Sequence, residues 1–584
     1  MTSASGCIAV PDKLTRWEAG PDDSARAEAL ARRHGLTPLL ARILARRFPA
    51  RNGDLSEFLN PQLGLVHSPL ALRGMEPAVQ RIVEAMDRRE RIVVFGDYDV
   101  DGLSASALLW RVFRWLGHPV EVYIPNRLSE GYGLNIPALK QLADGGARLV
   151  ITVDNGISAV EEIAYARSRN LDVIVTDHHQ THPPLPQARA IVNPNQPGCT
   201  YPCKVLSGVG VAFKVAHALL MTLRPGSDEA REFLKDQLDL VALGTVADVV
   251  PLIGENRILV KHGLRRLALT RKAGLRMLMD VAGLRTSHLT SSAISFMLAP
   301  RLNAAGRTDD PHAAFELLTT DSEARALDLA RHLGRFNDTR RRIEESIFKQ
   351  ALARIESDGH ADDPVLVLAG EDWSIGVLGL VAGRLVRQFY KPAICLELQK
   401  PHARGSCRSI PEYDIHAGLC VCEDVLEEFG GHSQAAGLSI SPDRIPQLRR
   451  AIGEHFRSVA GRSQLYPTLR LDGWISHDEI DINSVGDLQK LEPYGEGNPE
   501  PVFAINGAEL AGPPRGLKRN TLKFSIRRGA ERLDVIGFGM ADAALPLLAQ
   551  AEGSCLELAF TPALDSYNGY ESVILQLKAL RIQT

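Results

Sequence analysis

The sequence predicts an α/β protein of several domains, in which two regions of alternating strands and helices precede a C-terminal region of short strands. Three short β-branched runs, at 91–95, 149–153 and 172–176, are flanked by helical periodicity, and this alternation is typical of a parallel sheet. A chain of 584 residues is also too long to fold around one hydrophobic core. We therefore expect three or four domains, one of them built on a parallel sheet.

Changes in periodicity along the chain indicate five regions. Residues 1–74 are predicted to be a helical, arginine-rich cap on the first domain, and residues 75–255 to form the parallel-sheet domain. Residues 256–357 are helical and end in an amphipathic helix, expected over 338–357, that connects to a second α/β domain at 358–463. Residues 464–584 contain short strands separated by turns, which favour a small β-barrel.

Aspartates at alternate positions follow the first strand, in Asp97-Tyr98-Asp99-Val100-Asp101-Gly102. The next two strands end in Asp154-Asn155-Gly156 and Asp177-His178-His179, and an apolar helical stretch ends at Asp248. Because parallel strands end at one edge of the sheet, these groups are expected to converge. Carboxylates this close repel one another unless a proton or cation lies between them. A solvated Asp-rich turn could explain one such segment, but four together favour a two-metal site for Mg²⁺ or Mn²⁺.

The order of four motifs resembles that of the DHH phosphoesterase superfamily. They are Asp-Tyr-Asp-x-Asp-Gly at 97–102, Val-Asp-Asn-Gly at 153–156, Thr-Asp-His-His at 176–179 and Gly-Thr-x-Ala-Asp at 244–248. Tyr98 and the segment 129–135 are similar to the RecJ family, which contains single-strand-specific 5′→3′ DNA exonucleases; the likeness continues through 300–307, 430–432 and 494–503. The resemblance implies a DHH catalytic domain, a DHH-associated domain and a C-terminal OB-fold that binds single strands.

The resemblance also implies roles for the clustered side chains. Two Mn²⁺ or Mg²⁺ ions would be held by Asp99, Asp101, Asp154, His178 and Asp248. Asp97 is expected to help, either as a ligand or from behind the ligands. His179 would contact the scissile phosphate, and Asp177 would orient a histidine, as carboxylates behind a metal site commonly do.

Phosphate-binding residues are implied in the helical region and in the second α/β domain. Ser406, Arg408 and His432 are expected to face the metal centre across a cleft, with Arg408 holding a phosphate through paired hydrogen bonds. Arg301 and Asn303 would contact the same or a neighbouring phosphate. Without the resemblance, the glycines beside these residues are equally compatible with ordinary turns. A glycine-rich stretch at 373–384 could also bind phosphate, but it has Ser374 where the family is expected to have histidine.

A local excess of positive charge marks the C-terminal region. Residues 513–532 contain seven basic residues and one acidic residue in a chain of net charge −3, which predicts a strand-binding face that includes Lys518, Arg519 and Arg527. Three aromatic residues could stack on bases, namely Phe524, Phe538 and Tyr567. Core packing is the alternative for all three and is favoured for Phe538. A DNA contact by the arginines of residues 1–74 is a weaker possibility than a solvated charged face.

Composition is typical of a soluble globular protein, with 45% hydrophobic and 23% charged residues. No apolar stretch approaches the roughly 20 residues needed to cross a bilayer, and the first residues lack the pattern of a signal peptide. The close cysteine pairs Cys199/Cys203 and Cys420/Cys422 lack the Cys-x-x-Cys spacing of a zinc site. We expect a cytoplasmic protein with reduced thiols and no membrane contact.

The expected function is metal-dependent hydrolysis of single-stranded DNA from its 5′ end, which the resemblance connects with DNA repair and recombination. The resemblance further implies a single-strand-binding protein and a repair helicase as partners. One alternative is a DHH phosphoesterase that acts on short oligonucleotides or nucleotide phosphates, which would need neither the basic barrel nor so long a chain. A non-catalytic scaffold is a second alternative, disfavoured because all four motifs are intact.

Overall fold

A computed structural model describes residues 15–21, 23–48, 55–126, 130–285, 289–306, 312–399, 401–461, 465–528, 531–549, 555–567 and 570–583. They divide into two compact units, which are described separately. The first comprises Phe48–Asn337 and Leu488–Glu500. The second comprises the described parts of Ser5–Arg47, Asp338–Asp487 and Pro501–Thr584.

The first unit is built on a five-stranded sheet in which every strand is parallel to its neighbours, in the order β3-β2-β4-β5-β6. The strands are β2 (Arg91–Phe95), β3 (Glu121–Tyr123), β4 (Ala147–Val153), β5 (Asp172–Thr176) and β6 (Ala190–Val192). The helices that precede or connect them are α3 (Leu55–Leu59), α4 (Met75–Asp87), α5 (Val100–Trp115), α6 (Ile136–Asp144) and α7 (Val160–Ser168). The predicted parallel-sheet domain is confirmed.

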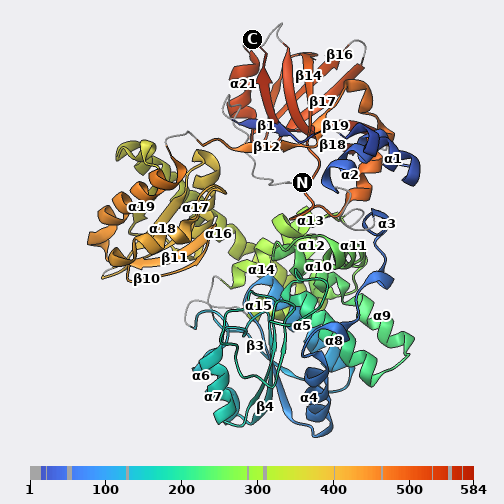
Figure 1. Ribbon diagram of the computed structural model, residues 1–584, viewed down its shortest axis with the longest axis vertical. Coiled ribbons are helices and arrows are strands. Elements are labelled where there is room, and N and C mark those ends of the chain that lie inside the picture. The colour runs from blue at the N-terminus through green and yellow to red at the C-terminus, as the bar shows by residue number, and fades with distance from the viewer. Residues whose placement is uncertain are drawn as a thin grey trace. The chain divides into compact units, whose positions relative to one another are not determined.

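Both faces of this sheet are buried, as expected for parallel strands covered by helices. Ile92 and Val94 face a core shared with α4, α5 and α8 (Gly208–Leu223). Val93 and Phe95 face the opposite core, formed with α6 and α7. Figure 1 shows α6 and α7 on one side of the sheet and α4 and α8 on the other.

A mainly helical layer follows the sheet. Its elements are α9 (Asp228–Asp236), α10 (Leu238–Ala247), α11 (Gly254–Ala268), α12 (Ala273–Ala282), α13 (Ser291–Ala293), the π-helical turn η3 (Ile294–Leu298), α14 (Ala299–Ala305) and α15 (His312–Thr319). The connecting helix α16 spans Glu323–Ser357 and thus begins earlier than position 338. The reason is a second apolar stripe, Ala326, Leu329, Ala330 and Leu333, which packs into the core of the first unit. The later stripe around Ile347 and Ala351 packs on the second α/β domain.

The second α/β domain contains a mixed five-stranded sheet in the order β10-β11-β9-β8-β7. Its strands are β7 (Leu366–Gly370), β8 (Ala393–Leu398), β9 (Ala403–Arg408), β10 (Glu428–His432) and β11 (Ala435–Ile440), and its helices are α17 (Ile375–Phe389), α18 (Ile415–Val421) and α19 (Ile445–Ala460). Only β7 and β8 are parallel among these pairs. The domain therefore matches the predicted α/β class.

The C-terminal region forms a seven-stranded sheet that closes on itself. The strands of this sheet are β13 (Gly473–Trp474), β14 (Phe503–Leu510), β15 (Arg515–Leu517), β16 (Thr521–Arg528), β17 (Glu531–Gly537), β18 (Leu556–Tyr567) and β19 (Tyr570–Ile582). The region also contains β12 (Thr468–Leu471), which lies outside this sheet, and the helices α20 (Ile482–Asp487) and α21 (Ala541–Ala549). The order β14-β18-β19-β17-β16 returns to its start because Glu509 and Leu510 of β14 also pair with Arg527 and Ile526 of β16. The predicted barrel is confirmed, and this pairing is the closure that the sequence did not reveal.

The N-terminal segment packs differently from the expectation. Strand β1 (Arg16–Ala19) pairs in parallel with β12, and it is followed by α1 (Ser24–His34) and α2 (Pro38–Arg47). Arg47 forms a hydrogen-bonded ion pair with Asp472, and Arg42 pairs with Glu479. The prediction that this segment caps the first domain is therefore wrong for residues 16–47, because β1 pairs with β12 and the carboxylate partners of Arg42 and Arg47 lie in the C-terminal region.

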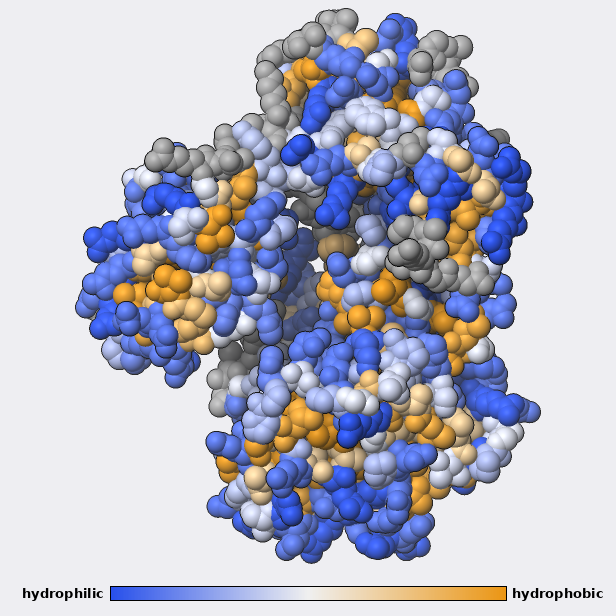
Figure 2. Space-filling model, viewed as in Figure 1, coloured by the Kyte–Doolittle hydropathy of each residue, from blue (hydrophilic) through white to orange (hydrophobic). Residues whose placement is uncertain are grey.

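One face of the molecule and the described thiols can be characterised. Figure 2 shows a mainly hydrophilic face on which hydrophobic residues lie in separate groups. The cysteines within the described ranges are free. Among the helices of the described ranges, none has the length and apolarity that a bilayer crossing requires.

Candidate metal centre and substrate contacts

Three neighbouring strands deliver acidic and histidine side chains to the carboxyl edge of the first sheet. Phe95 of β2 is in register with Thr152 of β4, and Val153 of β4 with Thr176 of β5. The segments 97–101, 154–156 and 177–179 follow these strand ends. Helix α10 adds Asp248 as its C-terminal cap. Four stretches that are distant in sequence therefore meet at one place.

The side chains at this edge form three overlapping sets of potential metal ligands. The sets are Asp97, Asp99 and Asp154; Asp101, His178 and Asp248; and Asp154, His178 and His179, and within each set the ligand atoms lie within 4.8 Å of one another. His178 Nε2 lies 3.1 Å from Asp154 Oδ1 and 3.5 Å from Asp248 Oδ2. Because Asp154 is common to two sets, its carboxylate could take part in holding more than one cation.

Buried polar atoms at this centre fit a pair of divalent cations. Asp154 Oδ1, His178 Nε2 and Asp248 Oδ2 are buried and have no hydrogen-bond partner among the described residues. Buried polar atoms in folded proteins nearly always have such a partner. A set dominated by carboxylate oxygens, with imidazole in support, suits Mg²⁺ or Mn²⁺.

Asp101 is held by the first turn of α8. Its Oδ2 accepts a 2.6 Å hydrogen bond from the Gly208 N–H, and its Oδ1 accepts a 2.9 Å bond from the Val209 N–H. The partial positive charge at a helix N-terminus, about half an elementary charge, favours a carboxylate there. Gly208 must be glycine, because a Cβ at this position would lie 2.6 Å from Asp154 Oδ1.

These backbone groups were not identified from the sequence. Their only signal was the glycine-rich helix start Ser207-Gly208-Val209-Gly210, which by itself is weak evidence for anion binding. Gly244 of α10 is a similar case, since a Cβ there would lie 2.6 Å from Asp101 Oδ1. Both glycines allow helix backbones to approach the carboxylates closely.

Asp177 is buried, and hydrogen bonds to its two carboxylate oxygens orient the neighbouring residues. Its Oδ1 lies 2.7 Å from His179 Nδ1 and accepts hydrogen bonds from the His178 and His179 N–H groups, while its Oδ2 accepts one from the Ile157 N–H at 3.0 Å. Burial alone would raise the pKa of Asp177, but these hydrogen bonds and the charge of His179 hold it below its usual value. The ionised carboxylate then requires His179 Nδ1 to be the donor, which fixes the tautomer of the neutral ring.

Tyr132 is a further residue at this edge to which the sequence assigned no role. Its hydroxyl donates a 3.1 Å hydrogen bond to the backbone carbonyl of Asp154. Its ring lies edge-on to His179 with 6.1 Å between the ring centroids, and the residue is 54% exposed. The nearby Ser129 lies outside the described residues.

Burial and mutual repulsion shift the pKa values of the ligands. Burial, followed by the charges of neighbouring aspartates, raises the pKa of Asp101 and of Asp154 well above the usual value. The same two causes raise the pKa of Asp248 to about 7. Burial lowers the pKa of His178 to about 4, so its imidazole is neutral at pH 7 and retains a lone pair for a cation.

Helix α14 carries Arg301 and Asn303 and brings Asn303 to the first motif. Asn303 Oδ1 accepts a 3.1 Å hydrogen bond from the Val100 N–H and so supports the aspartate-bearing turn. Arg301 donates a 2.5 Å hydrogen bond to the Met297 carbonyl. Asn303 is therefore placed to position the metal-binding turn, a role that the sequence did not suggest. Arg307 lies outside the described residues.

Ser406, Arg408 and His432 share one face of the second sheet. Ser406 and Arg408 are two positions apart on β9, and Arg408 donates a 3.0 Å hydrogen bond to Ser406 Oγ. Ala435 pairs with both Arg408 and His432, so these two side chains are about two strand spacings, roughly 10 Å, apart. Gly379 of α17 leaves room for this group, since a Cβ there would lie 2.7 Å from an Arg408 nitrogen. Ser374 is the N-cap of α17 and forms no side-chain cap hydrogen bond.

The basic stretch of the barrel is partly neutralised. Lys523 forms an ion pair with Asp534 at 3.1 Å, and Arg527 one with Glu509 at 3.3 Å. Lys518 and Arg519 lie exposed in the turn between β15 and β16, and within the described ranges they have no ion-pair partner. These two residues are therefore better placed than Arg527 to bind an external anion.

The aromatic residues of the barrel differ from the expectation. Phe524 is 3% exposed and points into the barrel with Leu522 and Ile526, so it cannot stack on a base. Phe538, for which core packing was favoured, is 39% exposed because it lies just beyond the end of β17, where the alternation of the strand stops. The side chain of Tyr567 lies outside the described residues.

Matches to three domain families follow this architecture. The N-terminal domain of the DHH family matches residues 91–245, the DHHA1 domain matches 362–458 and the RecJ OB domain matches 471–579. A parallel sheet with clustered carboxylates at its carboxyl edge, followed by these two domains, defines a metal-dependent phosphoesterase of the DHH class.

Relatives that match most of the chain identify one family within this class. The chain is 35% identical over 553 residues to the single-stranded-DNA-specific exonuclease RecJ of Escherichia coli, covering 92% of this chain and 95% of that protein. It is 36% identical over 530 residues to the Bacillus subtilis protein of the same name, covering 90% of this chain and 66% of that protein. The chain belongs to the family of RecJ single-stranded-DNA-specific exonucleases.

Solved structures agree with this assignment. The crystal structure of Thermus thermophilus RecJ in complex with Mn²⁺ has a TM-score of 0.81 at 29% identity, covering 97% of this chain and 80% of that chain. The structure of the same protein with Mg²⁺ has a TM-score of 0.75 at 28% identity, covering 97% and 78%. The carboxylate and histidine cluster of this chain is accordingly a site for divalent Mn²⁺ or Mg²⁺.

Substitution of Asp154, which belongs to two sets of potential ligands, tests the metal centre. Asp154→Asn keeps a side chain that tolerates the left-handed backbone of this position, where φ is +64°. It removes the negative charge shared by two ligand sets, so nuclease activity should fall more than about 100-fold, the upper range for loss of a residue behind a metal ligand. Activity at saturating Mn²⁺ and the unfolding temperature without metal are the measurements. Asp144→Asn, at a surface ion pair with Arg169, is the control, and near-normal turnover of folded Asp154→Asn would contradict the assignment.

The raised pKa values also predict a pH dependence. The folded, metal-free protein should bind protons that the unfolded chain releases, so its free energy of unfolding should fall as pH rises from about 4 to about 7. The Asp248 part is on the order of 4 kcal/mol at most, and Asp248→Asn should remove it. Affinity for Mn²⁺ should rise over the same window, because the cation displaces protons. Denaturation in EDTA and calorimetry in buffers of different ionisation enthalpy measure both effects; Mn²⁺ binding without proton release at pH 6 would contradict the prediction.

Proposed function

We propose that this protein hydrolyses phosphodiester bonds of single-stranded DNA from the 5′ end. The observation that carries the proposal is the carboxylate of Asp154, which belongs to two ligand sets at the edge of the first sheet. Membership of the RecJ family supports single-stranded DNA as the substrate. The 5′→3′ direction and a role in DNA repair and recombination are inferred from the resemblance in sequence.

The metal-binding residues proposed are Asp99, Asp101, Asp154, His178 and Asp248, with Asp97 as a further ligand. The position of Asp97 in one set with Asp99 and Asp154 supports its direct participation. Two bound cations would lower the pKa of a shared water and stabilise charge on the entering and departing oxygens. The neutral imidazole of His178 and the amide-held carboxylate of Asp101 keep the geometry fixed before substrate arrives.

His179 is proposed to contact the scissile phosphate. Burial alone would lower its pKa, but the hydrogen bond and the charge of Asp177 raise it. The raised pKa favours the protonated ring, whose exposed part can donate a hydrogen bond to a phosphate oxygen. Asp177 is a positioning residue in this proposal, because its oxygens are already occupied by His179 and by backbone N–H groups.

Ser406, Arg408 and His432 are proposed to hold a phosphate of the strand. The three side chains share one sheet face, and the guanidinium of Arg408 can bind phosphate through two parallel hydrogen bonds. Arg301 is proposed to contact a phosphate near the metal centre, while Asn303 supports the metal-binding turn. We also propose that the protein acts in the cytoplasm with a single-strand-binding protein and a repair helicase, on the basis of the family resemblance.

Digestion of end-labelled oligonucleotides tests the proposed function. With Mn²⁺ or Mg²⁺, a 5′-labelled single strand should release its label as a short product at once, while a 3′-labelled strand should shorten gradually. Blunt duplex should be digested far more slowly, since the family acts on single strands. Equal digestion of blunt duplex, or early release of the 3′ label, would contradict the proposal.

Two comparisons in the same assay separate the alternatives. Activity confined to di- and trinucleotides would favour the short-oligonucleotide phosphoesterase. Arg408→Ala should lower digestion of long single strands and leave Mn²⁺ binding unchanged, because Arg408 lies outside all three ligand sets. Loss of Mn²⁺ binding in this variant would mean that its effect is structural.

Removal of positive charge from the barrel tests whether this region binds single-stranded DNA. Neutralising Lys518, Arg519 and Arg527 should weaken binding of single-stranded DNA and flatten its salt dependence, with the log–log slope falling by about 0.7 for each lost phosphate contact. Lys518 and Arg519 should account for most of the change, because Arg527 is paired with Glu509. Binding is measured by fluorescence anisotropy from 50 to 300 mM salt with EDTA present. Lys140→Gln with Arg148→Gln is the control, and an unchanged slope in the triple variant would exclude this face as a binding site.

A further inference from the structure

The chain turns sharply just after Asp248, the residue that caps α10. Val249 has a left-handed backbone, with φ at +59°, which is unfavourable for a β-branched side chain. The residue is 64% exposed, so burial of its side chain does not account for this conformation. A strained residue of this kind owes its conformation to the contacts of the surrounding chain. Those contacts are made by residues 250–253, which lead into α11.

A second segment, far along the sequence, packs against these residues. The backbone carbonyl of Glu496 accepts a 2.7 Å hydrogen bond from the Leu252 N–H. A Cβ added at Gly495 would lie 2.7 Å from Leu252 Cδ1. A Cβ added at Gly497 would lie 3.2 Å from Pro251 Cβ. The two glycines therefore allow the second segment to lie in close contact with the chain that follows Asp248.

The second segment is a closed turn, residues 494–498, which we call the bracing turn. Gly495 and Asn498 exchange two backbone hydrogen bonds, at 2.9 and 3.1 Å. The Asn498 side chain is 2% exposed and donates to the carbonyls of Leu491 and Pro493, at 2.7 and 2.9 Å. The shape of the bracing turn is therefore set by its own hydrogen bonds.

Other residues of the first unit anchor the bracing turn. Arg257 of α11 is 1% exposed, and its guanidinium donates to the carbonyls of Leu491 and Lys490, at 2.7 and 2.9 Å. The Ser291 hydroxyl donates a further hydrogen bond to the Tyr494 carbonyl. Because a buried charge is costly without its hydrogen bonds, the contacts of Arg257 resist displacement of this part of the chain.

The opposite side of the segment 250–253 is held by Asn256. The Asn256 side-chain amide donates to the carbonyls of Pro251 and Val205, at 3.1 and 2.6 Å. Val205 lies just before α8, whose first turn binds Asp101. The segment that follows Asp248 is thus fixed between the bracing turn and the support of a second carboxylate of the metal centre.

A fixed continuation of the chain matters because Asp248 is the last residue attached to α10. Its N–H donates to the Gly244 carbonyl at 2.9 Å, but helix ends fray where no further helical bonds follow. The Asp248 carboxylate must stay close to its neighbours, since its Oδ2 lies 3.5 Å from His178 Nε2. Contacts that hold Val249 in its strained conformation also keep this end of α10 in place.

We propose that the bracing turn is a positioning element of the metal centre, which holds Asp248 in the geometry that a cation requires. The inference rests on the proposed role of Asp248 as a metal ligand, and it extends that site to residues 495–497, which lie outside all three ligand sets. Loosening the bracing turn should weaken metal binding although no ligand has been changed.

Gly497→Ala disturbs this contact from the side of the bracing turn. The added methyl group is strained at a φ of +71° and lies closer to Pro251 than an ordinary van der Waals contact. Affinity for one of the two Mn²⁺ ions should fall about 10–100-fold, the range for residues behind metal ligands. Isothermal titration calorimetry without DNA measures this affinity. In EDTA, hydrogen exchange of the backbone over 249–256 should become about tenfold faster or more.

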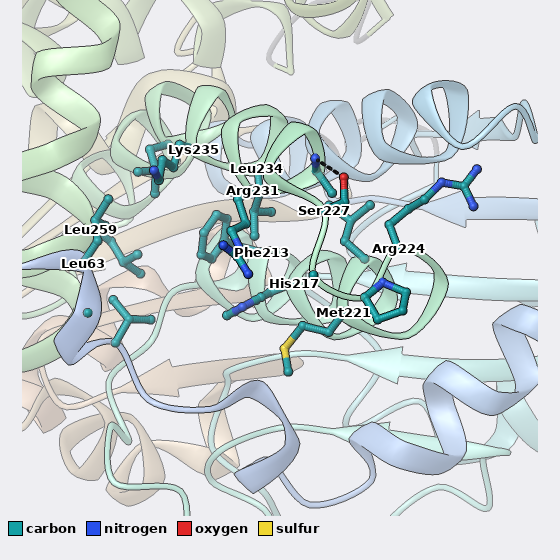
Figure 3. A pocket seen from close by; sticks show the side chains of 17 residues that line it. Leu63, Phe213, His217, Met221, Arg224, Ser227, Arg231, Leu234, Lys235 and Leu259 are labelled. Atoms are coloured by element: carbon teal, nitrogen blue, oxygen red, sulfur yellow. Dashed lines mark hydrogen bonds between the residues drawn. The ribbon is translucent and has the colours of Figure 1, made fainter.

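Gly226→Ala is the matched control. Its methyl group is equally strained, at a φ of +74°, but no described atom beyond its chain neighbours lies within 4 Å of the added Cβ. Gly226 lies in the turn between α8 and α9, beside Arg224 and Ser227 in Figure 3. About 24 Å of α8 separate this turn from the Asp101-binding first turn. This variant should bind Mn²⁺ like the wild type.

A double-variant cycle shows whether the bracing turn acts through Asp248. Gly497→Ala combined with Asp248→Asn should bind Mn²⁺ no more weakly than Asp248→Asn alone, because coupled residues are not additive. Asn498→Ala loosens the bracing turn without adding bulk, and it should also lower Mn²⁺ affinity and speed exchange over 249–256. Unfolding temperatures in EDTA establish that each variant is folded.

The proposal is overturned by any of three results. They are wild-type Mn²⁺ affinity in folded Gly497→Ala and Asn498→Ala, an equal loss of affinity in Gly226→Ala, and additive losses in the double variant. Metal binding and hydrogen exchange are both measured without substrate. An inactive wild-type protein would therefore contradict the proposed nuclease function and leave the test of the bracing turn intact.

Discussion

Buried carboxylates that repel one another lie at the edge of the first sheet, and the helices around them are arranged to hold these groups in place. Asp101 and Asp154 are almost completely buried, and this burial, together with the charges of neighbouring aspartates, raises the pKa of both carboxyl groups. A fold selected only for stability would not gather these groups in one place. Divalent cations relieve the repulsion, so the same arrangement that destabilises the metal-free protein provides affinity for metal.

Backbone N–H groups of the scaffold around this cluster bind its carboxylate at Asp101. Because these groups carry no net charge, the negative charge of the cluster remains available to attract cations. The amides at the start of α8 bind Asp101, and Gly208 and Gly244 let two helices approach within contact of the ligands. Asp177 plays a different part, because His179 and backbone amides satisfy it. Asp177 is thus an ionised carboxylate that positions its neighbours. The adjacent His178 is a neutral imidazole, so the two side chains have opposite electrostatic roles.

The sequence predicted the parts of the fold and of the site that depend on local pattern. Aspartates directly after β-branched runs predicted the convergence of β2, β4 and β5, because parallel strands end at one edge. The sequence could not predict pairings between distant segments, such as β14 with β16 or β1 with β12. The residues of one strand do not specify which distant strand it pairs with. The N-terminal segment was consequently assigned to the wrong neighbour, and the contact of the Gly208 amide with Asp101 was missed.

Side-chain exposure failed to follow local pattern where strands end or helices extend. Phe524, expected to stack on bases, is buried because it follows the in–out alternation of β16. Phe538, expected in the core, is exposed because it lies just beyond the end of β17. The count of basic residues in the sequence overestimated the positive charge available on the barrel. Glu509 and Asp534, on neighbouring strands, form ion pairs with Arg527 and Lys523. The support of Asp101 is a more distant case, because the Gly208 N–H that binds it lies 107 positions further along the chain. Helices α8 and α10 support Asp101 and Asp248, so a displacement of either helix would move a carboxylate of this cluster.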